Sequence, residues 1–392
     1  MIFRTLLLFA AVWPSCAQTL TVKEEVFQNR AAWVLDNGLI RVSLLRGGGH
    51  IAEVRLISSD PVKNINPMRV PHYPTIEPYQ YDPAKHDAIY GDSPHRRLSS
   101  GYMGHLLCFP FYGPASSEEE IRAGLGNHGE APIVEWRKTK QDARPDSITF
   151  WYGADLTKTQ YRVERAVTMR RNQRHVRIEE WVENLTSYDR PIHWMQHATF
   201  GAPFAEPGKT FLDTSGTRGQ VSGGRPDNRS LLPDSTVDWP QGTSAGGRKV
   251  NLRAMQPLAK AGTYYVLLMD PSRQQQFFTM YHADYRVLIG YVYPSDGNPW
   301  LADWQENRSN ASLPWNNQVV ARGIEFGSTP FAEGMRKSID RGSLFGVPAY
   351  RWIGAKQKLK TEYTIFLQEI PAAYSGVRNV SLRDGTPVVE GR

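Results

Sequence analysis

Four short segments concentrate histidines and carboxylates in surroundings that could support acid–base chemistry. They are LGNHGEAP at 125–132, WMQHATFG at 194–201, NPWLADWQE at 298–306 and ARGIEFGSTPF at 321–331. A carboxylate and an imidazole placed beside the same substrate can exchange protons with it near neutral pH. The four segments therefore predict that the chemistry of this chain is proton transfer.

Glu325 is the most informative single carboxylate. It lies within VVARGIEF, an apolar run typical of a strand, and burying an unpaired charge there would be costly. A buried Glu325 would therefore be paired or functional, whereas a half-exposed strand would simply turn it to solvent. Arg322 lies three residues away, so in a strand it would face the opposite side.

The histidines at 193 and 197 allow more than one interpretation. In a strand, His193, Met195 and His197 share one face, and a histidine beside aromatic residues is often only structural. A zinc site built on both histidines would need a helical spacing and a third ligand, and neither is evident. The sequence therefore predicts no metal site.

Other catalytic classes lack their signatures. The chain contains no G-x-S-x-G elbow, phosphate-binding loop or dinucleotide fingerprint, which argues against serine hydrolases and nucleotide-dependent enzymes. Cys108 lies in the apolar run HLLCFPFYG and is expected to be a buried, inert thiol. The net charge of +7 is scattered, and the one dense basic run, at 169–177, lies where a hairpin turn is expected. A solvated turn explains that run better than nucleic-acid binding.

The chain that positions these residues has the pattern of a β protein. Its 392 residues are 40% hydrophobic and 11% aromatic, which provides a large core and favours strands. Asp36-Asn37-Gly38 interrupts two apolar runs and predicts a hairpin turn. Further strands are expected at 148–152, 161–169, 175–182, 264–269, 276–281, 287–293, 318–326 and 362–368.

Helices are expected to be few and short. Ser116 or Ser117 can cap one helix over 117–123. Two stretches, 57–100 and 205–250, read as long irregular insertions, and long ordered loops are often functional. Many strands with irregular insertions predict a large antiparallel sandwich.

The N-terminus reads MIFRTLLLFAAVWPSCAQ, with Arg4 before a short apolar core. We expect residues 1–17 to be a signal peptide cut after Ala17, and residues 18–392 to form a single domain in an exported protein. A lipid anchor on Cys16 is the weaker alternative. No later segment approaches the length of a membrane span.

In this order, the segments resemble those of the aldose 1-epimerase (galactose mutarotase-like) family. NGLIRVSLLRGGGHIAEVRL at 37–56 is similar to the family's opening hairpin, and NHGE at 127–130 to its His-Gly loop. NLTSYDRPIHWMQHATFG at 184–201 resembles the strand with the second histidine, and 321–331 the strand with the catalytic glutamate. The resemblance covers most of the chain and implies a β-supersandwich that binds sugar on a concave sheet face.

The resemblance also implies a reaction, the interconversion of α and β sugar anomers. Glu325 would be the base that removes the proton of the C1 hydroxyl, and His197 the acid that protonates the ring oxygen. Both are expected to face each other across a cleft about one sugar ring wide. No cofactor is needed because only protons move. The family's arginine segment has only Arg96 and Arg97 as candidates here.

The remaining site residues are expected to bind the mono- or oligosaccharide substrate. By resemblance, His128 would bind the sugar and help to polarise its ring oxygen. Asn127 and Glu130 would hydrogen-bond sugar hydroxyls from the same loop. Trp304 would stack on an apolar sugar face, although a core position suits a tryptophan equally well.

Two alternatives use the same scaffold for another purpose. A carbohydrate-binding protein without turnover would have Glu325 engaged in a salt bridge or His197 buried. A lyase or hydrolase would have a second carboxylate near Glu325, for example Glu306 or Asp303.

Overall fold

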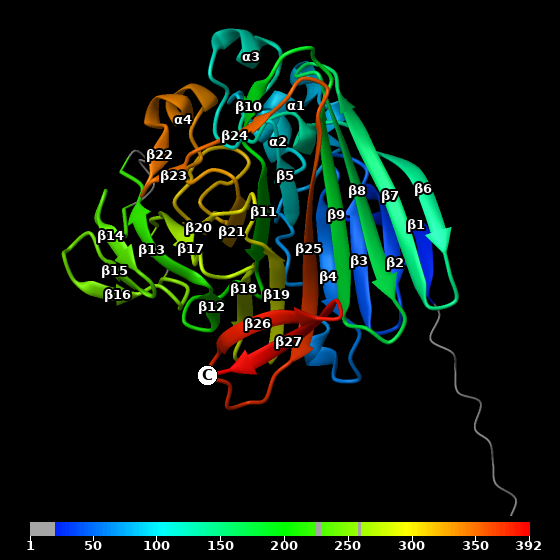
Figure 1. Ribbon diagram of the computed structural model, residues 1–392, viewed down its shortest axis with the longest axis vertical. Helices are drawn as coiled ribbons and strands as arrows, with labels where there is room; N and C mark the ends of the chain where they lie inside the picture. Colours follow the sequence, from blue (N-terminus) through cyan, green and yellow to red (C-terminus); the bar gives the residue numbers. More distant parts are fainter. Residues whose placement is uncertain (1–19, 224–228, 258–259) are drawn as a thin grey trace, which may run out of the picture.

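The computed structural model describes residues 20–392 apart from 224–228 and 258–259. The expected signal peptide, its cut after Ala17 and the alternative anchor Cys16 lie outside the described residues. Within them, the strands form two large antiparallel sheets that pack face to face (Figure 1). No helix in this described part is long and apolar enough to cross a membrane.

The larger sheet comprises 13 strands in the described part of the chain, and every hydrogen-bonded pair within it is antiparallel. In order across the sheet they are β1 Thr21–Phe27, β2 Arg30–Asp36, β3 Ile40–Leu45, β4 Ile51–Leu56, β5 His105–Cys108, β11 Met195–Gly201, β21 Val320–Gly327, β20 Trp300–Asn307, β17 Thr263–Met269, β13 Gly216–Val221, β14 Thr236–Asp238, β15 Gln241–Thr243 and β16 Lys249–Asn251.

The second sheet has eight strands among the described residues. In order they are β12 Thr210–Thr214, β18 Gln275–His282, β19 Val287–Pro294, β25 Lys358–Glu369, β9 His175–Asn184, β8 Tyr161–Arg170, β7 Ser147–Leu156 and β6 Arg137–Ala143. Smaller ladders pair β10 Arg190–Ile192 with β24 Arg351–Ile353, β22 Ser343–Leu344 with β23 Val347–Pro348, and β26 Val377–Arg383 with β27 Thr386–Gly391.

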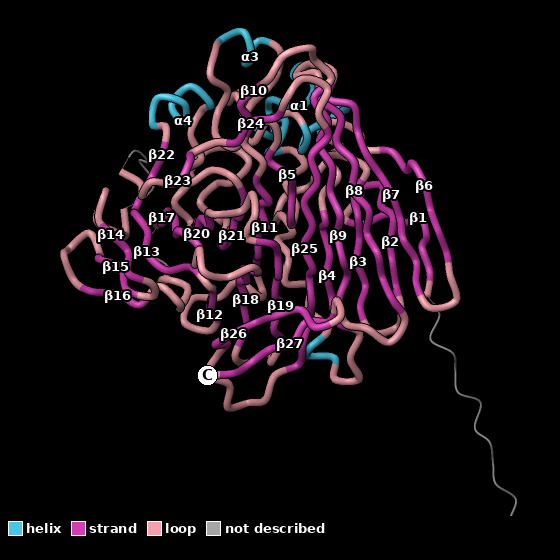
Figure 2. Tube along the Cα trace, viewed as in Figure 1, coloured by secondary structure: helices cyan, strands magenta, loops and turns pink. Residues whose placement is uncertain are grey.

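Helices contribute little, and Figure 2 shows how far strands and loops dominate the chain. The α-helices are α1 Pro83–Tyr90, α2 Arg96–Ser99, α3 Glu118–Arg122 and α4 Met335–Arg341, with 3₁₀ turns at Pro61–Lys63, Pro78–Gln80 and Ala131–Ile133. All four labelled helices lie at one end of the sheets, at the top of Figure 1, whereas the hairpin β26–β27 lies at the other end.

The observed elements confirm the predicted antiparallel all-β class and correct one part of it. A strand is present at each expected range, Gly38 has the left-handed φ of 77° that its hairpin turn requires, and Ser117 caps α3. The stretch 205–250, expected to be irregular, instead carries β12 to β16. These strands are only three to six residues long and mostly polar, so they lack the apolar alternation that reveals a strand.

The core lies between the two sheets, and strand alternation decides which residues enter it. On β11 and β21, Ala198, Phe200, Ile324 and Phe326 belong to the main core cluster. Residues between them point to the other face of the large sheet, where a separate apolar cluster includes Met195. This outer face of β11 and β21 is covered by the loops that follow β4, β5 and β20, so it is buried as well.

A buried polar network joins the two sheets behind this region. Arg165 on β8 and Glu180 on β9 form an ion pair at 2.6 Å, and both are fully buried. The same carboxylate accepts hydrogen bonds at 2.6 Å from the indole of Trp194, just before β11, and from the amide of Gln196 on β11. His105 contacts the Gln196 Oε1 atom at 2.9 Å, and burial lowers the pKa of His105 to about 3. The network therefore fixes how β11 lies over the second sheet.

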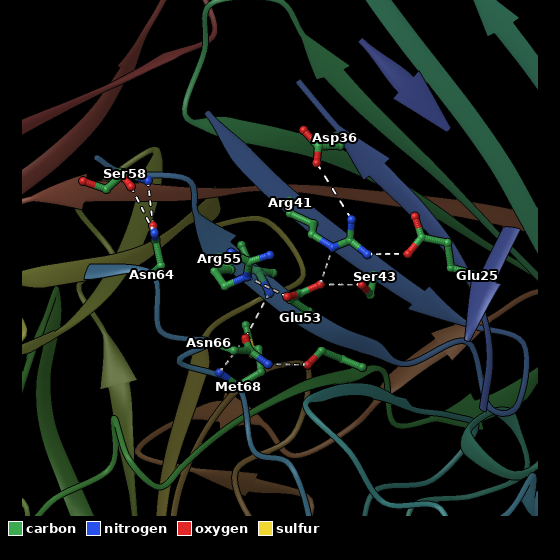
Figure 3. Close-up of polar contacts among 12 residues, drawn as sticks. Glu25, Asp36, Arg41, Ser43, Glu53, Arg55, Ser58, Asn64, Asn66 and Met68 are labelled. Carbon is green, nitrogen blue, oxygen red and sulfur yellow. Dashed lines mark hydrogen bonds and ion pairs between the residues drawn. The ribbon is translucent and has the colours of Figure 1, made fainter. Parts of the chain in front are cut away.

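The outer face of β3 and β4 carries a second polar cluster, drawn in Figure 3. Glu53, almost fully buried, accepts from the Ser43 hydroxyl at 2.6 Å and pairs with Arg41 and Arg55. Below it, the Asn66 amide bonds the backbone of residues 52, 54 and 68. These bonds anchor the start of the long insertion that later supplies part of the candidate site.

Removal of the Arg165 charge should be strongly destabilising. Arg165→Met would leave Glu180 buried without its partner, and we expect a loss of about 3–5 kcal/mol in the free energy of unfolding. Chemical denaturation measures it. The matched control is Arg162→Met on the same strand, whose partner Asp155 is 60% exposed and whose change should cost at most about 1 kcal/mol. Equal effects of the two substitutions would contradict the assigned role.

Candidate functional site

The register between β11 and β21 brings His197 and Glu325 together. His197 lies directly opposite Glu325 across the ladder, and Thr199 lies opposite Gly323. On the other side of β21, Trp304 of β20 is opposite Gly323. Because cross-strand partners project from the same face, all these residues point to the outer face of the large sheet.

This face forms the floor of a cavity of about 500 Å³. Its floor includes His197, Glu325 and Trp304, and its walls come from loops distant in the sequence. The β4–β5 insertion supplies Tyr102, and the β20–β21 loop supplies Trp315. A volume of this order is ordinary for a small-molecule site.

His197 and Glu325 are in direct contact, which differs from the expected separation of about one sugar ring. The His197 Nε2 atom lies 3.1 Å from the Glu325 Oε1 atom, and the side chains are only 4% and 3% exposed. Neighbouring strands bring opposed side chains this close as a matter of sheet geometry. Burial raises the pKa of the Glu325 carboxyl well above its usual range. Glu325 therefore does not point to solvent.

The other ring nitrogen of His197 is held by two hydroxyl groups. The Thr199 Oγ1 atom lies 2.9 Å from His197 Nδ1, and the Tyr102 hydroxyl lies 2.6 Å from that Oγ1. Burial raises the pKa of the Tyr102 hydroxyl, so it keeps its proton. We assign the proton on Nδ1 to a hydrogen bond with Thr199, which leaves Nε2 to exchange a proton with Glu325.

The glycine-rich loop places His128 against His197. Their rings meet edge to face with centroids 5.0 Å apart. His128 has a left-handed φ of 69°, and the glycines on either side of Asn127-His128 let this loop turn tightly beside β5. The His128 ring contacts Cys108 Sγ at 3.2 Å and the Asn127 amide at 3.0 Å. Asn127 and His128 both line the cavity.

Trp304 also lines the cavity, with its ring centroid 6.1 Å from that of His197 and 6.1 Å from that of Trp315. It is half-buried and packs against two outer apolar clusters. Trp304 is therefore packed on one side and faces the cavity on the other. The indole forms one wall, and its packing keeps it rigid.

Solved structures share this architecture, although no family model and no curated protein matches the sequence. A "putative aldose 1-epimerase" from Klebsiella pneumoniae superposes with a TM-score of 0.60 at 13% identity, covering 90% of this chain and 84% of that one. A galactose mutarotase-like protein from Clostridium acetobutylicum gives 0.58 at 14% identity, covering 90% and 99%. A TPR-domain containing protein from Parabacteroides distasonis gives 0.57 at 10% identity, covering 90% of this chain and 50% of that one.

The chain has the galactose mutarotase-like fold. This confirms the expected β-supersandwich, and the last of these similarities shows that the same fold also occurs inside a longer protein of a different description.

Within this mutarotase-like fold, Glu130 lies away from the cavity. Its carboxylate accepts hydrogen bonds from the backbone of Lys158 at 3.1 Å and from the backbone and hydroxyl of Thr159 at 2.8 and 2.7 Å. Glu130 is 1% exposed. The sequence pattern could not separate it from its neighbours in the loop. We therefore assign it a structural role, tying the loop to the β7–β8 turn, in place of the expected contact with sugar.

The strand expected over His193 and His197 is broken in two. Ile192 ends β10, and β11 begins at Met195 in a different sheet. The His193 Nδ1 atom accepts a hydrogen bond from the Tyr112 backbone at 3.1 Å, and burial lowers the pKa of His193 to about 3. His193 therefore does not share a face with His197. Among the described residues, no cluster of three histidines, cysteines or carboxylates is placed to hold a metal.

The carboxylates of β20 separate onto the two faces. Asp303 points inward, where it binds Arg322 at 2.6 Å and the Tyr265 hydroxyl at 2.5 Å. Arg322 therefore faces away from Glu325, as the strand alternation predicts. Glu306 points to the outer face and lines the cavity, where its carboxylate accepts from the Ser309 hydroxyl at 2.8 Å.

Several cavity residues escape sequence analysis. Tyr102, Trp315 and His95 line the cavity, and of these only His95 lies in the 57–100 stretch whose length suggested a functional loop. Arg96 and Arg97, the arginine candidates, do not line it. Instead Arg69 lies behind the wall, with its guanidinium 4.7 Å from the Tyr102 ring centroid and 4.8 Å from that of Trp315.

Gly323 provides the space in which the acid–base pair sits. A Cβ atom at this position would lie 2.9 Å from His197 Cε1, 3.0 Å from Trp304 and 3.1 Å from Glu325 Oε1. Gly323→Ala should displace the pair, lower any activity at least about tenfold, and reduce stability by about 1–3 kcal/mol. Gly246→Ala, at a glycine with nothing within 4 Å, is the control and should change neither. Turnover and melting curves of both variants measure this.

Glu325→Gln should change the pH dependence of stability. The raised pKa means that the folded state holds a proton on Glu325 after the unfolded state has lost it, so wild-type stability falls as pH rises between the two pKa values. Gln mimics the protonated form. The Gln variant should therefore become more stable relative to the wild type as pH rises above the usual carboxyl pKa. Denaturation at several pH values measures the difference, and a pH-independent difference would contradict it.

Proposed function

We propose that this protein is an aldose 1-epimerase, an enzyme that interconverts the α and β anomers of a free sugar. The observation that carries the proposal is the contact between His197 and Glu325 on the floor of a cavity of sugar-binding size. The similarity to solved mutarotase-like proteins supports the fold on which this reaction is known to run, and the residues of the site supply the chemistry.

The contact suits the two atoms between which protons must move. The C1 hydroxyl oxygen and the ring oxygen are both bonded to C1, so they lie closer together than two hydrogen-bonded atoms. An acid and a base on neighbouring strands can reach both oxygens from one side of the sugar. The contact is compatible with the reaction. It also meets the expectation for a carbohydrate-binding protein without turnover, in which Glu325 is paired or His197 is buried, so activity must separate the two.

The reaction is balanced within the pair. Glu325 takes the proton of the C1 hydroxyl while His197 Nε2 gives its proton to the ring oxygen, and the bond between C1 and the ring oxygen breaks. Rotation about C1–C2 turns the aldehyde over, and the reverse transfers close the other anomer. The pair holds one exchangeable proton before and after each step, so no cofactor takes part. Burial makes the Glu325 carboxylate a stronger base.

The surrounding residues hold the pair and the sugar. Thr199 and Tyr102 fix the His197 ring through Nδ1. Asn127 would donate to a sugar oxygen from the glycine-rich loop, where His128 lines the cavity beside it, and Trp304 would cover an apolar face of the ring. We also propose, from the N-terminal sequence alone, that the protein is exported.

A hydrolase is the second candidate, because Glu306 lines the same cavity as Glu325. Two carboxylates flanking a glycosidic bond are the usual requirement for its hydrolysis. Release of new reducing ends from glycans, lost in both Glu306→Gln and Glu325→Gln, would establish this alternative. Binding of sugar without either activity would establish a binding protein.

Anomer exchange followed by NMR tests the proposal. The purified protein is mixed with glucose, galactose and other aldoses, and the rate of exchange is compared with that in buffer. Glu325→Gln and His197→Asn should each slow the catalysed exchange by about 10²–10⁴-fold, because each removes one proton-transfer group. Circular dichroism and melting curves check that both variants fold.

The matched control is Glu118→Gln, the same change on the exposed helix α3, where the side chain is 89% exposed. It should leave the exchange rate unchanged. No acceleration with any aldose, or acceleration that survives both site substitutions, would overturn the proposal.

A further inference from the structure

A second cavity of about 620 Å³ adjoins the candidate site. The two cavities share Pro114, Tyr264 and Ala332 in their linings. The anomeric chemistry of one sugar uses only the first of them. The proposed reaction therefore leaves the second cavity unused.

Both cavities lie on the same face of the large sheet. Tyr264 on β17 is opposite Trp304 on β20, so its side chain shares the outer face with the acid–base pair. On the next strand, Gln220 of β13 is opposite Val266, which places Gln220 on that face too. Ser222, just beyond β13, bonds the Tyr264 carbonyl through its backbone amide at 3.0 Å. The sheet thus provides one continuous floor from His197 to Ser222.

The partition between the cavities is rigid. The Tyr264 hydroxyl accepts a hydrogen bond from the Ala332 backbone at 2.8 Å and lies 3.1 Å from the Tyr112 hydroxyl. Tyr264 is 2% exposed, and Phe331 packs beside it at 6.5 Å between ring centroids. A ligand that spans both cavities would therefore meet them at a fixed separation.

The lining of the second cavity includes polar side chains and charged side chains of both signs. Gln220 and Ser222 contribute an amide and a hydroxyl, and a bidentate pair joins Arg341 to Glu333 at 2.7 and 3.0 Å. Its charged lining residues are three basic and two acidic: Arg336, Lys337, Arg341, Asp234 and Glu333. A mixed lining with this small charge excess suits a ligand rich in hydroxyl groups better than a strongly charged one.

We propose that the substrate is the reducing end of an oligosaccharide, with its reducing sugar over His197 and Glu325 and the next sugar in the second cavity. This inference rests on the proposed function and names the substrate class for the same site. The second sugar takes no part in proton transfer. Its binding energy helps to hold C1 against the pair, so extended substrates should react with a higher kcat/KM.

The test compares a monosaccharide with oligosaccharides that end in that same sugar. For glucose, the extended substrates are maltose, cellobiose and lactose, each with a reducing glucose. We expect kcat/KM for anomer exchange to rise at least about tenfold for one linkage over glucose itself. Gln220→Trp, which fills the second cavity, should abolish the advantage and leave the rate with glucose unchanged.

A second variant keeps the test valid if Gln220→Trp fails to fold. Lys337 is exposed on α4 and lines the second cavity, so Lys337→Trp should reduce the oligosaccharide advantage in the same way. Its matched control is Lys85→Trp on α1, at a lysine that is 75% exposed. Lys85→Trp should alter neither rate.

The outcomes separate the two proposals. Exchange of glucose with no gain for any oligosaccharide would overturn the second sugar site and leave the epimerase standing. Exchange of no sugar at all would overturn the epimerase. In that case calorimetric titration of the oligosaccharides into Glu325→Gln protein decides the second site alone. Binding that Gln220→Trp abolishes would support the site, and no binding would overturn it.

Discussion

The pairing register of β11 with β21 is the constraint on which the rest of the site depends. It places His197 opposite Glu325 and turns both toward the outer face of the large sheet. Because side chains alternate along a strand, a slip of one residue would present Gln196 or Ile324 to the cavity instead. The contact between His197 and Glu325 is thus a property of two strands and cannot be assigned to either alone.

Buried polar groups on the inner face make that register specific. Gln196, next to His197 in the chain, bonds Glu180 of the other sheet, and Arg322, three residues from Glu325, bonds Asp303. After a slip, these polar groups would face apolar surroundings or lose their partners, at a cost of several kcal/mol each. The inner network therefore holds the outer pair in place without touching the cavity.

The sequence predicts the elements better than the contacts between them. Alternation reveals the long strands, and the run around Glu325 already indicates a carboxylate that must be buried or paired. The contact with His197 could not be foreseen, because 128 residues separate the two and only the sheet order makes them neighbours. Likewise Tyr102 and Trp315 reach the cavity from loops whose sequences carry no periodic signal.

The local sequence pattern also could not separate residues of different roles within the glycine-rich loop. His128 and Glu130 stand two residues apart in the same loop, yet the first faces the cavity and the second ties the loop to Thr159. The left-handed turn at His128 and the following glycine reverse the chain between them. A histidine and a glutamate beside glycine are therefore insufficient to define a binding loop.

The site also contains two features that reduce the stability of the sheet. Glu325 is buried with a raised pKa, and Gly323 leaves without a side chain a strand position that a larger residue would fill. Burial of Glu325 costs desolvation energy, and a glycine at position 323 contributes no side-chain packing. A fold tolerates such local costs when the surrounding core is stable enough to offset them. Two packed sheets with a hydrogen-bonded network between them provide that stability, and His197 and Glu325 are only 4% and 3% exposed.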